Sequence, residues 1–196
     1  MHRIALILPA LLATGVAAQA QAQIVNPNDT GQGRLEIAGR APPACVLNAP
    51  TASGGQNATF TGTGATSGEI RIVEFGDPQT AQPRGAAINL ALPVICNAPH
   101  RLTITSTNGG LLRDGGNARN RQSPNGFGEF VGYRISASWA GQNASVQTIN
   151  NNVLAIATAD GGAGDMDLTI AVPPGGGALV AGRYADTVTV LFEAAF

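Results

Sequence analysis

The sequence contains no lysine, and charged side chains make up only 12% of its 196 residues. The eleven basic residues are all arginine and are balanced by twelve acidic residues, which gives a formal net charge of −1. A chain this close to neutrality lacks the basic surface that nucleic acids and anionic membranes attract. We therefore expect no nucleic-acid partner. Polarity comes instead from Ser, Thr, Asn, Gln and Gly, as in many exported β-proteins.

Cysteine and histidine are also scarce. Beyond the N-terminal apolar segment the chain has two cysteines, Cys45 and Cys96, and one histidine, His100. Two cysteines in an exported protein predict one disulfide, which for a loop of this length contributes about 4 kcal/mol. Two separate buried thiols are the alternative. A zinc site needs more ligands than these three residues supply. The sequence thus predicts no metal and no cofactor.

The signature of a hydrolase is absent as well. No Gly-x-Ser-x-Gly motif occurs, and His100 would need a nucleophile and an orienting acid before it could act in catalysis. His100 lies between Pro99 and Arg101, where we interpret it as an exposed turn residue. The sequence therefore predicts that the protein is not an enzyme.

Long apolar runs are confined to the N-terminus. Residues 4–18 are mostly apolar, follow Arg3, and precede the small-x-small pattern of residues 18–22. This arrangement predicts a secretory signal peptide over residues 1–22, because the run is too short for a membrane span. A buried helix is the alternative. No later segment could span a bilayer, so we expect an exported protein without an integral membrane span.

Apolar and polar residues alternate along most of the remaining chain, and no long stretch has helical spacing. Strands are predicted by this period of two, and turns by the Gly-rich and Pro-rich segments between them. Many short strands separated by such turns predict an all-β antiparallel sandwich of the Greek-key type. Leu35, Ile37 and Gly39, and likewise Ile70 and Ile72, alternate with their neighbours. The rows expected to face the core are Ile88, Leu90, Leu92, Val94 and Cys96; Leu102 and Ile104; Tyr133, Ile135, Ala137 and Trp139; Leu154 and Ile156; and Leu168, Ile170 and Val172.

The chain divides into three parts. We expect the signal peptide to be followed by a leader over residues 23–40, whose composition at 24–33 predicts a flexible segment and which ends in the short alternating segment 34–39. The sequence Pro42-Pro43 then interrupts any strand ladder. We expect residues 41–196 to form one domain of ordinary size.

Three sets of polar or aromatic residues invite a binding interpretation. Asp160, Asp165 and Asp167 lie in a Gly-rich segment that resembles a calcium loop, although an ordinary hairpin turn is the simpler interpretation. Residues 108–129 predict a long surface loop, whose arginines are either solvated or bind an anion. These arginines are Arg113, Arg119 and Arg121. Tyr133 and Trp139 are expected to be core residues, and a sugar-stacking surface is the alternative interpretation.

The last segment alternates to its final residue. Val188, Val190, Phe192, Ala194 and Phe196 share one face of an extended strand. An apolar face of this kind needs a cover.

The closing segment also carries a family resemblance. Residues 174–190, which contain Ala-Gly-Arg-Tyr-Ala-Asp-Thr-Val-Thr-Val, resemble the closing motif of spore coat protein U domains. Upstream, the order of Cys45, Phe75-Gly76 and Cys96, with Tyr133-Arg134-Ile135 after it, is similar to that of the family. The resemblance covers roughly residues 34–196.

The resemblance implies a structural role. Such domains include the subunits of archaic chaperone–usher pili, which are immunoglobulin-like sandwiches that lack one strand. A periplasmic chaperone, and later the N-terminal segment of a neighbouring subunit, supplies that strand. An outer-membrane usher assembles the subunits into a homo- or heteropolymer. The protein would then be secreted through the periplasm to the cell surface or into a fimbrium.

The resemblance assigns residues to both partners of this exchange. Leu35, Ile37 and Gly39 would be donor residues. The acceptor groove and chaperone contact would be formed by Val188, Val190, Phe192 and Phe196. Two alternatives stay open: residues 34–39 could complete their own domain, and the protein could be a self-complete secreted β-sandwich that binds carbohydrate or cell-surface matrix.

Overall fold

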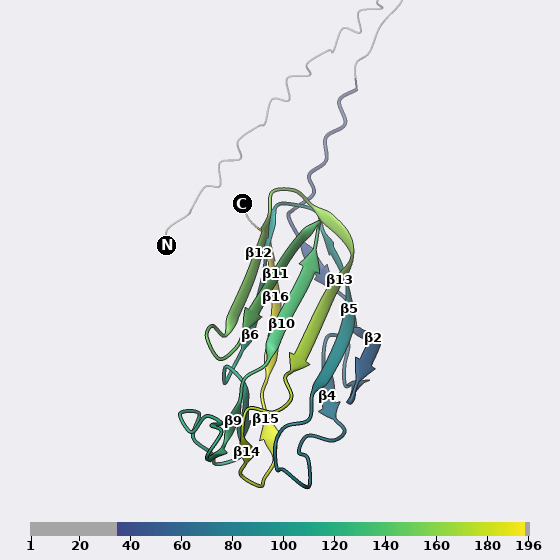
Figure 1. The fold of residues 1–196 in the computed structure, drawn as a ribbon. Coiled ribbons are helices and arrows are strands. Elements are labelled where there is room, and N and C mark those ends of the chain that lie inside the picture. The colour runs from purple at the N-terminus through teal and green to yellow at the C-terminus, as the bar shows by residue number, and fades with distance from the viewer. Residues whose placement is uncertain (1–34, 195–196) are drawn as a thin grey trace, which may run out of the picture. The chain divides into compact units, whose positions relative to one another are not determined.

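The computed structural model describes residues 35–194 (Figure 1). All regular structure in this range is β-strand, and no helix in it is long and apolar enough to cross a membrane. Residues 41 onward belong to one compact unit, while residues 35–40 belong to a separate unit and form no strand. The predicted signal peptide and the leader segment 24–33 lie outside the described residues.

The larger sheet is antiparallel throughout. Its order is β1–β5–β13–β10–β11, and β2 also pairs with β5. Its strands are β1 (Cys45–Leu47), β2 (Thr51–Gln56), β5 (Ala86–Cys96), β10 (Arg134–Trp139), β11 (Gln142–Gln147) and β13 (Gly162–Val172). The β5–β13 ladder extends over all 11 residues of each strand, and the two strands run side by side in Figure 1.

The second main sheet has β6 (His100–Ser106) at its centre, between β12 (Val153–Thr158) and β16 (Val188–Ala194). A smaller sheet places β7 (Leu111–Arg113) between β9 (Phe130–Val131) and β15 (Tyr184–Ala185). Two further pairs complete the fold. They are the hairpin of β3 (Ala58–Gly62) with β4 (Gly68–Ile72), and the parallel pair of β8 (Phe127–Gly128) with β14 (Ala178–Leu179).

The two main sheets share one hydrophobic core, an arrangement consistent with a β-sandwich. The alternating rows predicted from the sequence supply it: Ile88 to Cys96 from β5, Leu102 and Ile104 from β6, Ile135 to Trp139 from β10, and Leu154 and Ile156 from β12 are buried on alternate positions. Each large apolar side chain removed from water contributes about 1.5–3 kcal/mol. The predicted all-β class and the predicted core rows of these strands are therefore confirmed.

The prediction that His100 is an exposed turn residue is wrong. His100 is the first residue of β6 and is only 1% exposed. Its burial is possible because both ring nitrogens have hydrogen-bond partners, which offset the loss of water. These partners are the Ala98 carbonyl, the Thr158 hydroxyl and the Trp139 indole N–H.

The turn predicted around Asp160–Asp167 is shorter than expected. Strand β13 begins at Gly162, so Asp165 and Asp167 belong to it and pair opposite Pro93 and Ala91. Both carboxylates are exposed on the outer side of β13, while Met166 between them is buried. The apparent calcium loop is therefore a strand with acidic residues on its solvent side.

The segment 108–129, predicted to be one long surface loop, contains two strands, β7 and β8. Arg113 lies in β7, and its Nε donates to the Glu129 carboxylate at 2.9 Å. This pairing lowers the pKa of Glu129, with further help from hydrogen bonds donated by Asn120 and the Asn117 backbone. Arg119 and Arg121 are exposed. The three arginines therefore do not form one anion site.

Candidate functional site beside strand β16

Strand β16 has hydrogen-bonded neighbours on one edge only. It pairs with β6 from Val188 opposite Ser106 to Ala194 opposite His100. Within the part of the chain that the structure describes, no strand pairs with its other edge. That edge presents unpaired backbone groups, which is the condition that permits another strand to add.

The inward side chains of β16 are incompletely covered. Val188, Val190 and Phe192 pack against the core but are only half-buried. On the opposite face Leu191 is 47% exposed. The strand thus has the alternation of a core strand without the full burial of one.

A groove of about 640 Å³ has Val188, the first residue of β16, in its lining, whereas residues 189–194 do not line it. One wall comes from β4, and the other comes from β15 and the start of β16. The apolar lining residues that matter most here are Ile70, Ile72, Phe75, Ile88, Ile170, Val172 and Val188. The charged residues that line it are Glu69, Arg71, Arg183 and Asp186. An apolar interior with a few charges is the lining expected of a binding groove.

Asp186 fixes the junction between β15 and β16. Its carboxylate accepts hydrogen bonds from the Tyr133 hydroxyl at 2.7 Å and from the backbone N–H groups of Asn108 and Thr187 at 2.9 and 2.8 Å. The buried Ser106 hydroxyl donates to it as well. Four donors therefore converge on one carboxylate and hold the start of β16 against the end of β6.

Tyr133 is suited to this role because it stays protonated. Its burial, together with the adjacent Asp186 carboxylate, raises the pKa of Tyr133 far above the usual tyrosine value. A neutral phenol can donate its O–H to the carboxylate, whereas a phenolate would repel it. The Tyr133 ring itself lines the groove.

Tyr184 shapes the wall of the groove in β15. Its hydroxyl lies 2.8 Å from the Val180 carbonyl oxygen and 2.9 Å from that of Gly128 and shares its one hydrogen between them, and burial raises the pKa of Tyr184. Its ring lies 5.1 Å from that of Phe75, a favourable distance for a tilted aromatic pair. Nearby, Gly182 has a φ of 152°, and a Cβ added there would lie 3.0 Å from Arg113 Cγ. These contacts explain why the closing segment needs Gly and Tyr at these positions.

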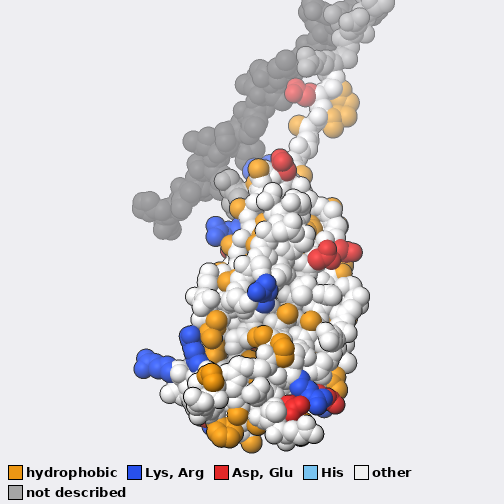
Figure 2. Space-filling view, viewed as in Figure 1, with side chains coloured by type: hydrophobic (Ala, Val, Ile, Leu, Met, Phe, Trp, Pro, Cys, Tyr) orange, Lys and Arg blue, Asp and Glu red, His pale blue; other side chains and the backbone are white. Residues whose placement is uncertain are grey.

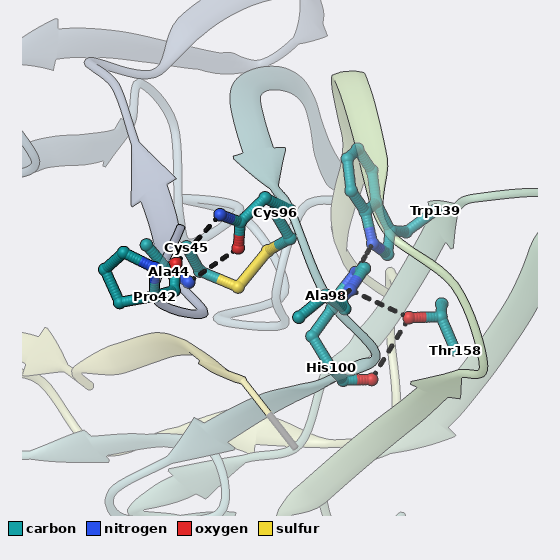
Figure 3. Close-up of a disulfide and its surroundings, with 9 residues drawn as sticks. Pro42, Ala44, Cys45, Cys96, Ala98, His100, Trp139 and Thr158 are labelled. Atoms are coloured by element: carbon teal, nitrogen blue, oxygen red, sulfur yellow. Dashed lines mark hydrogen bonds between the residues drawn. A yellow bond between two sulfur atoms is a disulfide. The ribbon is translucent and has the colours of Figure 1, made fainter. Parts of the chain in front are cut away.

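The far end of β16 contacts His100 and Trp139 through Phe192, and Figure 3 shows these two residues beside the disulfide. The Phe192 ring packs edge-on against Trp139, with centroids 5.6 Å apart. The predicted Cys45–Cys96 disulfide is present next to His100. Trp139 is only 3% exposed, so it is a core residue, as its strand pattern predicts, and offers no sugar-stacking surface.

The predicted site residues have different locations. Val188, Val190 and Phe192 lie on the inner side of β16, and Val188 lines the groove. Phe196 lies outside the described residues. Leu35 and Ile37 are 84% and 88% exposed, and neither they nor Gly39 belong to a strand.

Several residues that build the groove were not predicted to act together. The alternation of Ile70 with Ile72 and of Ile88 with Leu90 signals inward-facing residues, but it does not reveal which of them border an open groove. Asp186 belongs to the closing motif, yet its donors Ser106 and Tyr133 are distant in sequence. No local pattern connects these residues.

The described residues offer one set of side chains that could hold a metal. The sulfurs of Cys45 and Cys96 and a ring nitrogen of His100 all lie within 4.8 Å of one another. In the structure the two sulfurs are joined as a disulfide. The face drawn in Figure 2 is largely uncharged, with a few charged side chains, some of which lie next to a side chain of opposite charge.

Comparisons of the chain with protein-family models, with curated proteins and with solved structures found no match.

Proposed function

We propose that the protein is an exported structural subunit of a surface pilus or coat, and that its sandwich is completed by a β-strand from another chain. The observation that carries this proposal is the unpaired edge of β16, together with a groove of about 640 Å³ that has Val188, the first residue of β16, in its lining. A strand bound there would hydrogen-bond to β16 and place alternate side chains in the groove.

The order of the strands supports the proposal. In an immunoglobulin-like sandwich of seven strands, four form one sheet and three form the other. Here the larger sheet has six strands and the second has three, β12, β6 and β16, with β16 at its edge. We place the donor strand next to β16, as an addition to this second sheet. We therefore interpret the domain as an incomplete immunoglobulin-like Greek-key sandwich.

Energetics favour occupation of this groove. An added strand would pair the free backbone groups of β16, each hydrogen bond contributing about 0.5–1.5 kcal/mol. Burying one Leu or Ile side chain would add about 1.5–3 kcal/mol. The exposed Leu35 and Ile37 carry such side chains in a segment that forms no strand. We propose residues 34–39 as the donor segment, with Gly39 as its small member.

The resemblance to spore coat protein U domains suggests the other partners. A periplasmic chaperone would cover the groove before assembly, and an outer-membrane usher would join subunits into a homo- or heteropolymer. Phe192 and Phe196 would contact the chaperone. The assembled protein would be located at the cell surface.

Deletion of residues 24–40, with the signal peptide retained, tests the donor assignment. We expect loss of polymers, because each subunit would accept a strand but offer none, together with a folded chaperone-bound subunit. Electron microscopy for filaments and SDS-resistant ladders on gels are the measurements. Ladders that persist after the deletion would show that residues 34–39 are not the donor.

Two point variants provide a matched control. Ile37→Asn places an amide on the face proposed to enter the groove, whereas Glu36→Asn places the same residue on the opposite face. We expect Ile37→Asn to reduce polymer yield and Glu36→Asn to leave it unchanged. Equal effects of the two variants would contradict a strand with one inserted face.

A self-complete sandwich that binds carbohydrate or matrix is the weaker candidate. Trp139 is buried and Arg113 is paired with Glu129. This leaves Arg119 and Arg121 as the exposed arginines of that loop. Such a protein would be a soluble monomer whose binding is lost in an Arg119→Ala, Arg121→Ala double variant.

A further inference from the structure

The charged side chains that line the groove are of two kinds. Arg183 Nη1 lies 3.9 Å from the Asp114 carboxylate, and the Asp186 carboxylate accepts four hydrogen bonds. Glu69 and Arg71 of β4 are exposed, and neither forms a salt bridge within the part of the chain that the structure describes. The β4 wall of the groove therefore carries one unpaired negative charge and one unpaired positive charge.

Strand β4 has an open edge as well as open charges. It pairs with β3, and no other strand among the described residues pairs with it. On the β3 side, the cross-strand neighbours of Glu69 and Arg71 are the uncharged threonines Thr61 and Thr59. Side chains directly opposite each other on neighbouring strands are the ones that interact across a sheet. Partners of opposite charge can therefore come only from a strand that adds to the open edge.

The alternation along β4 determines which side of an added strand these charges would meet. Ile70 and Ile72 are partly buried against the core. Glu69 and Arg71 occupy the intervening, exposed positions. Side chains of neighbouring strands that lie opposite each other point to the same face of the sheet. A strand that places its apolar residues in the groove thus places its polar residues beside Glu69 and Arg71.

The proposed donor segment carries charges of both signs on the side that would stay outside the groove. They are Arg34, Glu36 and Arg40, which alternate with the apolar and small residues of the segment. If the segment runs parallel to β4 with Arg34 opposite Glu69, then Glu36 falls opposite Arg71. Both pairs then have opposite charges, which stabilise neighbouring strands. No other register, parallel or antiparallel, gives both charges of β4 an opposite charge.

We propose that the groove binds the leader of a second copy of this chain, and that Glu69 and Arg71 set the direction and register of that leader. Glu69 pairs with the Arg34 guanidinium of the incoming leader. Arg71 pairs with its Glu36 carboxylate. A leader with the two charges in the reverse order would meet two like charges and be disfavoured. This inference rests on the proposed function and adds the identity of the partner, which makes the assembly a homopolymer.

Charge reversal in the full chain tests the pairing, with SDS-resistant ladders as the measure of polymer yield. The acceptor variant carries Glu69→Arg and Arg71→Glu, and the donor variant carries Arg34→Glu and Glu36→Arg. Each variant alone should lower the yield about tenfold, because two attractive pairs become two repulsive pairs. A chain with all four substitutions has both pairs again and should polymerise as the unmodified chain does. Unchanged yields in the acceptor and donor variants would overturn the proposal.

Co-expression of the acceptor and donor variants tests the identity of the partner. The leader of each variant then matches only the groove of the other, so the mixture should form alternating polymers although neither variant does so alone. Recovery in the mixture also shows that both variants fold. A mixture that forms no polymers would overturn the assignment of the partner.

A control reversal separates this pairing from a general effect of charge. Arg134→Glu with Asp167→Arg reverses two exposed charges on the outer side of the larger sheet, and the yield should stay unchanged. An equal loss in this control would contradict the pairing. Failure of the proposed function has a different result, because Ile37→Asn would then leave the polymers intact. Loss of polymers in Ile37→Asn, with normal yields in the acceptor and donor variants, would remove only the register set by charge.

Discussion

Strands β6 and β16 lie side by side and alternate in the same way, but they differ in burial. Leu102 and Ile104 of β6 are 0% exposed, whereas Val190 and Phe192, their partners across the ladder, remain half-buried. Strand β6 has neighbours on both edges and β16 has one. The comparison shows that an alternating pattern determines which side of a strand faces inward, while the neighbouring strands determine how completely that side is covered.

The largest effect expected from this comparison is that of truncating the covered strand. Ile104→Ala should lower the free energy of unfolding by about 4 kcal/mol, because it leaves a cavity in a site with no access to water. Val190→Ala should cost about 1 kcal/mol, since its side chain is already partly solvated. Urea denaturation of the leader-deleted chain measures both values.

Filling the groove with an added strand should remove the difference in burial between β6 and β16. A synthetic peptide of residues 33–41, added in excess to the same variants, should raise the cost of Val190→Ala and leave that of Ile104→Ala unchanged. A cost of Val190→Ala that is insensitive to the peptide would argue against a strand beside β16.

The next largest effect concerns the carboxylate that ties the two strands together. Asp186→Ala should cost about 3 kcal/mol, because it leaves the Tyr133 and Ser106 hydroxyls without their acceptor. Asp186→Asn keeps one acceptor oxygen and should cost less. Thermal unfolding compares the variants, and equal stability of Asp186→Ala and the unmodified chain would exclude this role.

The smallest effect near neutral pH, and one that grows in alkali, is that of Tyr133. Its pKa is raised in the folded state, so the folded chain retains a proton that the unfolded chain loses above pH of about 10. The stabilisation from this residue is thus complete below that pH and declines as the pH rises further. Tyr133→Phe should show a shallower decline in stability between pH 9 and 11, followed by denaturant unfolding at each pH. Parallel curves would contradict the assigned proton.

The strands that form the core were predictable because the alternation of inward-facing and outward-facing positions along the sequence is enough to define them. Ile88 to Cys96 and Tyr133 to Trp139 alternate without interruption, and their rows are buried as expected. The position of His100 was not predictable, because its burial depends on Trp139 and Thr158, which lie 39 and 58 residues away. A single polar residue before a strand carries no sign of such partners.

The groove was the hardest feature to predict, because residues from β4, β5, β13 and β15, distant in sequence, line it together. The start of β13 was also not predicted, because Gly162 and Gly164 are typical of a turn, whereas both pair with β5 in the long ladder and belong to β13. Val188 and Val190 show the alternating apolar pattern of an ordinary core strand. Their second edge is unpaired because of the order of the strands in the sheet. Local alternation in the sequence carries no information about that order.

The disulfide also determines how the domain would respond to a pulling force applied through its leader. Such a force enters at Pro42–Ala44, which the Asn97 side chain holds through two hydrogen bonds. Strand β1 has only three residues and would peel away one bond at a time. The Cys45–Cys96 link passes the tension on to β5, whose ladder with β13 has 11 residue pairs. Because of the covalent bond, the load falls on this long ladder and not on a three-residue strand alone.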